Sequence, residues 1–130
     1  MNNILKIIIT GKMPSLNEYI NKINSNRFIG NLFKQNLENE LCKQITKQVR
    51  EQGFNAPFKK PVDFYITYYE KNKKRDKDNI ASSKKYILDA LVKSGVLQND
   101  GWKWVGNFKE EFKIGKDYEV IITMVEKNNG

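Results

Sequence analysis

The stretch KNKKRDKDNIASSKKYILDALVKSGVLQNDGWK, residues 71–103, carries the strongest structural and chemical signals in the chain. It opens with five basic residues in seven, and Asp76 and Asp78 stand among them. A helical pattern follows, Gly95 ends it, and a third aspartate, Asp100, comes shortly after. Carboxylates set in a basic loop suit a site that holds a divalent metal ion and a polyanion together.

The middle of this stretch predicts one amphipathic helix, capped by Asp78 or Asn79 and ending near Ser94. One side of the helix is apolar and is expected to pack on a sheet. Asp78, Lys85 and Asp89 share a separate stripe, because spacings of seven and four residues are close to whole turns. Two interpretations stay open: a solvated face with an ion pair between Lys85 and Asp89, or an acid–base–acid constellation with a chemical role.

The rest of the chain predicts an α/β (α+β) domain with the element order β-α-β-α-β-β, a mixed sheet and helices packed on it. Strands are expected where β-branched and aromatic residues concentrate, at 4–10, 62–69, 102–113 and 118–126. A helix is expected at 28–52, a loop at 11–17, and a turn at Gly115 between the last two strands. Residues 1–130 show no internal boundary, so they are expected to form one domain.

Composition narrows the chemistry. The chain has 23 basic and 15 acidic residues, a formal charge of +8, which favours nucleic acid or another polyanion as partner. It has no histidine, so a metal site must use mostly oxygen ligands, which suits Mg²⁺ or Mn²⁺. The single cysteine, Cys42, cannot form an internal disulfide, in line with a cytoplasmic location. No apolar run approaches the ~18 residues of a membrane span.

Four motifs resemble, in the same order, those of the RusA family of Holliday junction resolvases: RDKDN at 75–79, KK at 84–85, DAL at 89–91 and SGVLQND at 94–100. PSLN at 14–17 is similar to the family's N-terminal element, so the resemblance covers about 15–105. It implies a bacterial or phage-encoded, Mg²⁺-dependent endodeoxyribonuclease, with Mn²⁺ as a substitute. It also implies a homodimer that resolves four-way DNA junctions by paired cuts in recombination and repair.

Carried over residue by residue, the resemblance implies metal-binding carboxylates at Asp76, Asp78 and Asp100 and a catalytic lysine at Lys85, with Lys84 as the alternative. The segment between the D-x-D-N and D-A-L motifs is longer than in the best-known members by roughly one helical turn. Supporting roles are expected for Asn17, Asn79 and Asp89. Contacts with DNA phosphates are expected from Lys71, Lys73, Lys74, Arg75, Lys77 and Lys84.

These residue types suit phosphodiester hydrolysis. Carboxylate-bound Mg²⁺ can activate a water and neutralise developing charge, and a lysine can stabilise the phosphate or the leaving oxygen. Two other functions stay open: a non-catalytic DNA-binding module of the same fold, and a nuclease for other branched or RNA substrates. Trp102 and Trp104 either stack on exposed bases or pack within the protein.

Overall fold

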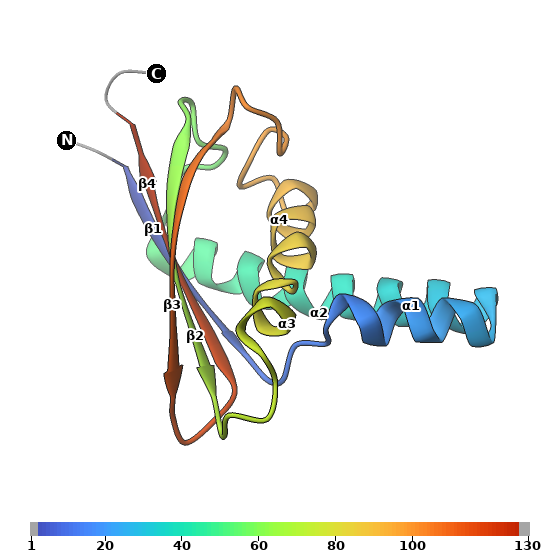
Figure 1. Ribbon diagram of the computed structural model, residues 1–130. Helices are drawn as coiled ribbons and strands as arrows, with labels where there is room; N and C mark the ends of the chain where they lie inside the picture. The colour runs from blue at the N-terminus through green and yellow to red at the C-terminus, as the bar shows by residue number, and fades with distance from the viewer. Residues whose placement is uncertain (1–2, 128–130) are drawn as a thin grey trace.

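Residues 3–127, which the computed structural model describes, fold into a four-stranded sheet and a set of helices (Figure 1). The elements are, in order, β1 (Ile4–Thr10), α1 (Leu16–Ser25), α2 (Arg27–Gln52), β2 (Val62–Glu70), α3 (Lys77–Ala81), α4 (Lys84–Lys93), β3 (Val105–Ile114) and β4 (Glu119–Glu126). The expected α+β class is confirmed. None of the helices in this part of the chain is long and apolar enough to span a membrane.

The strands form one mixed sheet in the order β1-β4-β2-β3. β4 pairs antiparallel with both β1 and β2, whereas β3 pairs parallel with β2. The last two strands are therefore not neighbours, because β2 lies between them. β3 also begins at Val105 rather than at Trp102, and Trp102, which is 99% exposed, stands in the turn before the strand.

The core lies between one face of the sheet and the helices. Residues alternate between buried and partly exposed along β1, β2 and β4, as expected for strands with one covered face. Leu41 and Ile45 of α2 and Ile87 and Leu91 of α4 are buried in the same cluster. Burial of each such side chain contributes about 1.5–3 kcal/mol, so this layer anchors α2 and α4 on the sheet.

Three glutamines one turn apart on α2 close the outer edge of β1. Gln48 donates through Nε2 to the Ile8 carbonyl (2.7 Å) and accepts the Ile8 N–H at Oε1 (2.8 Å). Similar bonds continue along the row, from Gln44 to Thr10 and from Gln52 to Lys6. The side-chain amides thus satisfy backbone groups that an edge strand otherwise exposes.

Helices α1 and α2 form a hairpin that extends away from the sheet (Figure 1). Ser15 caps α1 and Asn26 caps α2, each through a side-chain oxygen that accepts backbone N–H groups. The helices meet at Gly30, where an added Cβ would lie 2.5 Å from Ile23 Cγ1. The loop expected at 11–17 is therefore shorter than predicted, because its last two residues begin α1.

The prediction of a single helix from Asp78 to Ser94 is wrong, because the segment divides into the two helices α3 and α4. At the break, the hydroxyls of Ser82 and Ser83 donate to carbonyls three residues earlier, at 2.6 and 2.9 Å. Such bonds compete with the backbone hydrogen bonds that would continue a helix. The stripe expected to join Asp78 with Lys85 does not extend across this break.

The glutamine row makes a stability prediction. Gln48→Ala leaves the Ile8 N–H and carbonyl without their side-chain partner, so the free energy of unfolding should fall by about 1–3 kcal/mol. Urea denaturation followed by circular dichroism measures the change. Gln35→Ala, at an exposed position on the same helix, is the control. Equal stability of the two variants would show that β1 does not depend on the amide.

Candidate active site

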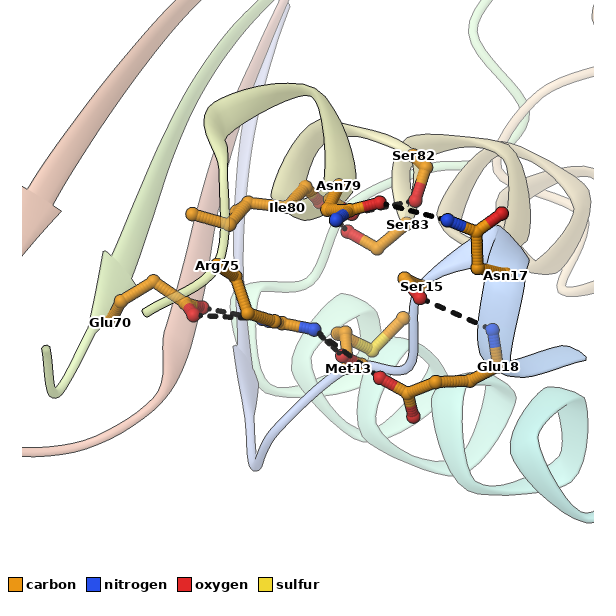
Figure 2. A network of polar contacts seen from close by, with 10 residues as sticks. All are labelled: Met13, Ser15, Asn17, Glu18, Glu70, Arg75, Asn79, Ile80, Ser82 and Ser83. Atoms are coloured by element: carbon orange, nitrogen blue, oxygen red, sulfur yellow. Dashed lines mark hydrogen bonds and ion pairs between the residues drawn. The ribbon is translucent and has the colours of Figure 1, made fainter. Parts of the chain in front are cut away.

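A buried ion pair holds the loop between β2 and α3. Glu70 ends β2, and its carboxylate accepts two hydrogen bonds from the Arg75 guanidinium, at 3.0 and 2.9 Å (Figure 2). Arg75 Nη1 also donates to the Met13 carbonyl at 2.7 Å. The side chains of Arg75 and Glu70 are only 15% and 10% exposed. Arg75 was expected to contact phosphates, but its guanidinium faces inward and joins this loop to the segment after β1.

The two asparagine-containing motifs meet next to this ion pair. Asn17 Nδ2 donates to Asn79 Oδ1 at 3.4 Å, which links the start of α1 to α3 (Figure 2). Arg75 Nη1 also lies 3.9 Å from a carboxylate oxygen of Glu18 in the first turn of α1. The expected supporting residues Asn17 and Asn79 therefore lie where they brace the loop that carries the aspartates.

Asp76 and Asp78 lie at the N-terminal turn of α3, and both are exposed. Asp76 occupies the capping position, two residues earlier than the sequence pattern predicts, and makes no capping side-chain hydrogen bond among the described residues. Asp78 accepts the N–H of Asn79 at 3.0 Å. Asp76 also lines a cavity of about 430 Å³, whose basic side chains come from Lys73, Arg75, Lys77 and Lys113.

Asp100 lies at the other end of the helical layer. It is exposed in the turn before β3, where the Val105 N–H donates to the Gly101 carbonyl at 3.0 Å. The ten residues of α4, about 15 Å of helix, separate this turn from α3. Within residues 3–127, no three histidine, cysteine, aspartate or glutamate residues form a group that could hold a metal ion. The expected convergence of Asp76, Asp78 and Asp100 therefore does not occur within one chain.

The two candidate lysines have different surroundings. Lys84 Nζ donates to Glu110 Oε1 on β3 at 3.1 Å, and the hydroxyl of buried Tyr68 donates to Glu110 Oε2 at 2.7 Å. Burial, assisted by Glu110, raises the pKa of Tyr68 far above its ordinary value, so this hydroxyl stays protonated. Lys85 is exposed, and the described residues contain no ion pair between it and Asp89. Lys84 is the lysine that faces the sheet.

Three lysine ammonium groups lie over aromatic rings of β3 and of the residue before it. The three rings are four residues apart in the sequence. The lysine Nζ atoms lie 5.2, 4.4 and 5.8 Å from the ring centroids, in the pairs Lys103–Trp104, Lys84–Phe108 and Lys77–Phe112. Lys71, Lys73, Lys74 and Lys77 are exposed in or next to the loop after β2. This surface runs from the turn of Asp100 to the loop of Asp76. Its exposed lysines suit contact with a phosphate backbone, whereas the charge of Lys84 is paired with Glu110.

Two acidic residues were missed by the sequence reasoning. Glu70 and Glu110 both face the covered side of the sheet, where one binds Arg75 and the other binds Lys84 and Tyr68. The alternation of buried and exposed positions along β2 could have identified Glu70 as an inward-facing residue. Buried positions fall on Phe64, Ile66 and Tyr68, so the next one falls on Glu70. An acidic residue at an inward position requires a cationic partner nearby.

The fold and the site together define a basic domain with paired carboxylates, suited to act on nucleic-acid phosphodiesters. The family model described as "Endodeoxyribonuclease RusA" matches residues 11–124. The chain therefore belongs to the RusA family and is an endodeoxyribonuclease, which confirms the resemblance carried by its motifs. The family acts on branched DNA junctions, and its nucleases generally depend on a divalent metal. No curated protein matches the chain.

The ion pair under the loop predicts a stability effect. Arg75→Lys keeps a positive charge but lacks the planar group that binds both Glu70 oxygens and the Met13 carbonyl together. The free energy of unfolding should therefore fall by about 1.5–3 kcal/mol. Thermal unfolding of the variant measures this loss. Lys74→Ala, one residue away and exposed, is the matched control. An unchanged melting temperature for Arg75→Lys would mean that charge alone holds the loop.

Proposed function

We propose that this chain is a Mg²⁺-dependent, structure-selective endodeoxyribonuclease that resolves four-way DNA junctions by paired phosphodiester hydrolysis in recombination and repair. The observation that carries the proposal is the position of Asp76 and Asp78. They lie on an exposed loop beside a basic cavity, and the Arg75–Glu70 ion pair anchors that loop. Membership of the RusA family supports the junction as substrate.

The metal donors are assigned across a homodimer. Carboxylates are the ligands that Mg²⁺ and Mn²⁺ prefer, so the donor type fits. One chain, however, brings only Asp76 and Asp78 to one turn, and α4 separates them from Asp100. We assign the third carboxylate to Asp100 of the partner subunit. A two-fold enzyme also suits a junction with two equivalent strands to cut.

The other residues of the site act on the DNA. Bound Mg²⁺ would supply the Lewis acidity that activates a water and neutralises charge on the phosphate. Lys84 is the proposed catalytic lysine, because it lies on the β3 side of the helices and Glu110 fixes its ammonium group. Lys85 stays the alternative. Phosphate contacts on either side are assigned to Lys71, Lys73, Lys74 and Lys77, whereas Arg75 acts by holding the loop through Glu70.

Asp76→Asn, Asp78→Asn and Asp100→Asn should each abolish cleavage of a synthetic four-way junction in Mg²⁺ while junction binding survives. Removing a carboxylate weakens metal binding without adding repulsion toward DNA. Gel assays of binding and of nicking, with EDTA as the no-metal control, measure the two properties separately. Binding without nicking by the unmodified protein would favour a non-catalytic module, and preferred cutting of flaps or RNA would change the substrate.

Mixing the inactive variants tests the shared site. Asp76→Asn and Asp100→Asn chains, allowed to exchange subunits, should recover nicking, because one site of each mixed dimer then has all three carboxylates. Asp76→Asn mixed with Asp78→Asn is the control. Each of its sites lacks one carboxylate of the same loop, so it should stay inactive. No recovery in the first mixture would refute the assignment of Asp100 to the partner subunit.

Lys84→Ala should slow single-turnover cleavage at least about tenfold more than Lys85→Ala, because loss of one positioned donor to a reacting phosphate has a large effect. Both variants remove one positive charge from the same helix, so the comparison controls for the electrostatic attraction of DNA. A larger defect in Lys85→Ala would return the role to the lysine first expected from the motif spacing.

A further inference from the structure

The two tryptophans of the chain have different surroundings. Trp104 is half-buried, and its carbonyl accepts the Val62 N–H at 3.0 Å, so it is tied to β2. Lys103 Nζ lies 5.2 Å from its ring centroid. Trp102 is 99% exposed, and no aromatic ring or cation of residues 3–127 stacks on its indole. The ring of Trp102 is thus open to another molecule.

Hydrogen bonds fix the turn that carries Trp102. Asn99 Oδ1 accepts the Gly101 N–H at 2.8 Å. The Gly101 carbonyl accepts the N–H groups of Trp104 and Val105, both at 3.0 Å. Trp102 lies between these partners, so the turn holds its side chain toward solvent before any ligand arrives. A group that is already in position loses less conformational freedom when it binds, and this increases its contribution to affinity.

Trp102 also lies beside a residue of the proposed metal site. It follows Asp100 by two residues, so their Cα atoms are at most about 7 Å apart. In the proposed function Asp100 binds the metal ion that holds the scissile phosphate, and the role inferred for Trp102 rests on that assignment. Successive nucleotides of a strand are about 3.4 Å apart along a duplex axis. The indole is therefore within reach of the nucleobases on either side of the scissile phosphate.

We propose that Trp102 stacks on a nucleobase next to the scissile phosphate and thereby directs cleavage to the branch point of a DNA junction. Every base has a π-face, so stacking on an indole does not require a particular sequence. It does require a face that no neighbouring base covers. Bases inside a linear duplex are covered on both faces, whereas base pairs that border an open branch point have one face uncovered. The tryptophan therefore favours branched DNA over linear DNA.

The charge around Trp102 favours nucleic acid over an apolar protein surface. Lys103 is exposed next to it, and the Lys103 ammonium lies over the ring of Trp104. A cation beside an open aromatic ring suits an unstacked nucleotide, because the cation contacts the phosphate while the ring contacts the base. An apolar partner that covered Trp102 would instead desolvate the neighbouring ammonium group, which costs free energy.

Fluorescence reports the stacking directly. Trp104→Phe leaves Trp102 as the only tryptophan of the chain. Binding of a four-way junction in EDTA should quench its emission and lower its accessibility to acrylamide at least about threefold, because a stacked base covers the ring. A linear duplex of equal length, also at saturation, should leave most of that accessibility unchanged. Trp102→Phe, in which only Trp104 emits, is the matched control.

Loss of the ring tests its role in selectivity. Trp102→Ala should lower the affinity for a four-way junction, relative to linear duplex, at least about fivefold, because stacking of one base contributes roughly 5- to 100-fold to affinity. Trp102→Phe should keep most of the preference, and the salt dependence of binding should not change because no cation is removed. Phe28→Ala, which removes another exposed ring at the start of α2, is the control.

Two results would overturn the stacking role. One is an indole that is already shielded from acrylamide before DNA is added, as a second copy of the chain would shield it. The other is an equal junction preference in Trp102→Ala and the wild type. Quenching and lost preference without nicking by the wild type in Mg²⁺ would support the stacking role and refute the nuclease proposal. Nicking by the wild type with no effect of Trp102→Ala would do the opposite.

Discussion

The ion pair between Arg75 and Glu70 is the interaction on which the arrangement of the site depends. Its two side chains are 15% and 10% exposed, so each would be a largely desolvated charge without the other. Through this pair and the Met13 carbonyl, the end of β2, the aspartate loop and the segment after β1 become one unit. Asp76 and Asp78 are therefore exposed to solvent on a loop whose backbone this ion pair holds in place.

The basic residues of the opening motif consequently divide into two groups. Arg75 holds the loop through its ion pair with Glu70. The lysines of the motif are instead exposed: Lys71, Lys73, Lys74 and Lys77. Arginine suits the inward role, because its planar group binds two carboxylate oxygens at once, and lysine suits solvated contact with phosphates. A count of positive charge therefore overestimates the number of residues that can touch DNA.

The sequence was a good guide wherever a local pattern decides the structure. The strands near 4–10, 62–69 and 118–126 and the long helix ending at Gly53 follow from β-branched runs, periodic apolar residues and a left-handed glycine. The sequence motifs were also enough to identify the RusA family. Such signals depend only on neighbours along the chain.

Features set by side chains or by distant contacts were not predictable in the same way. The helix breaks at Ser82 and Ser83 because two hydroxyls bond backward, a competition that helical periodicity does not register. That break separates Asp78 from Lys85 and brings Lys84 toward Glu110. The distance between Asp100 and α3 depends on the direction of α4 across the sheet, which motif spacing along the chain does not determine.

The row of glutamines on α2 has a consequence for solubility at high concentration. A sheet whose two edge strands could both pair with strands of other chains would add chains without limit and grow into a fibre. Here the amides of Gln44, Gln48 and Gln52 occupy the hydrogen-bonding positions of β1, so recruitment is confined to the other margin. Since only one margin of each sheet is then open to pairing, edge-to-edge addition could not continue past a single partner.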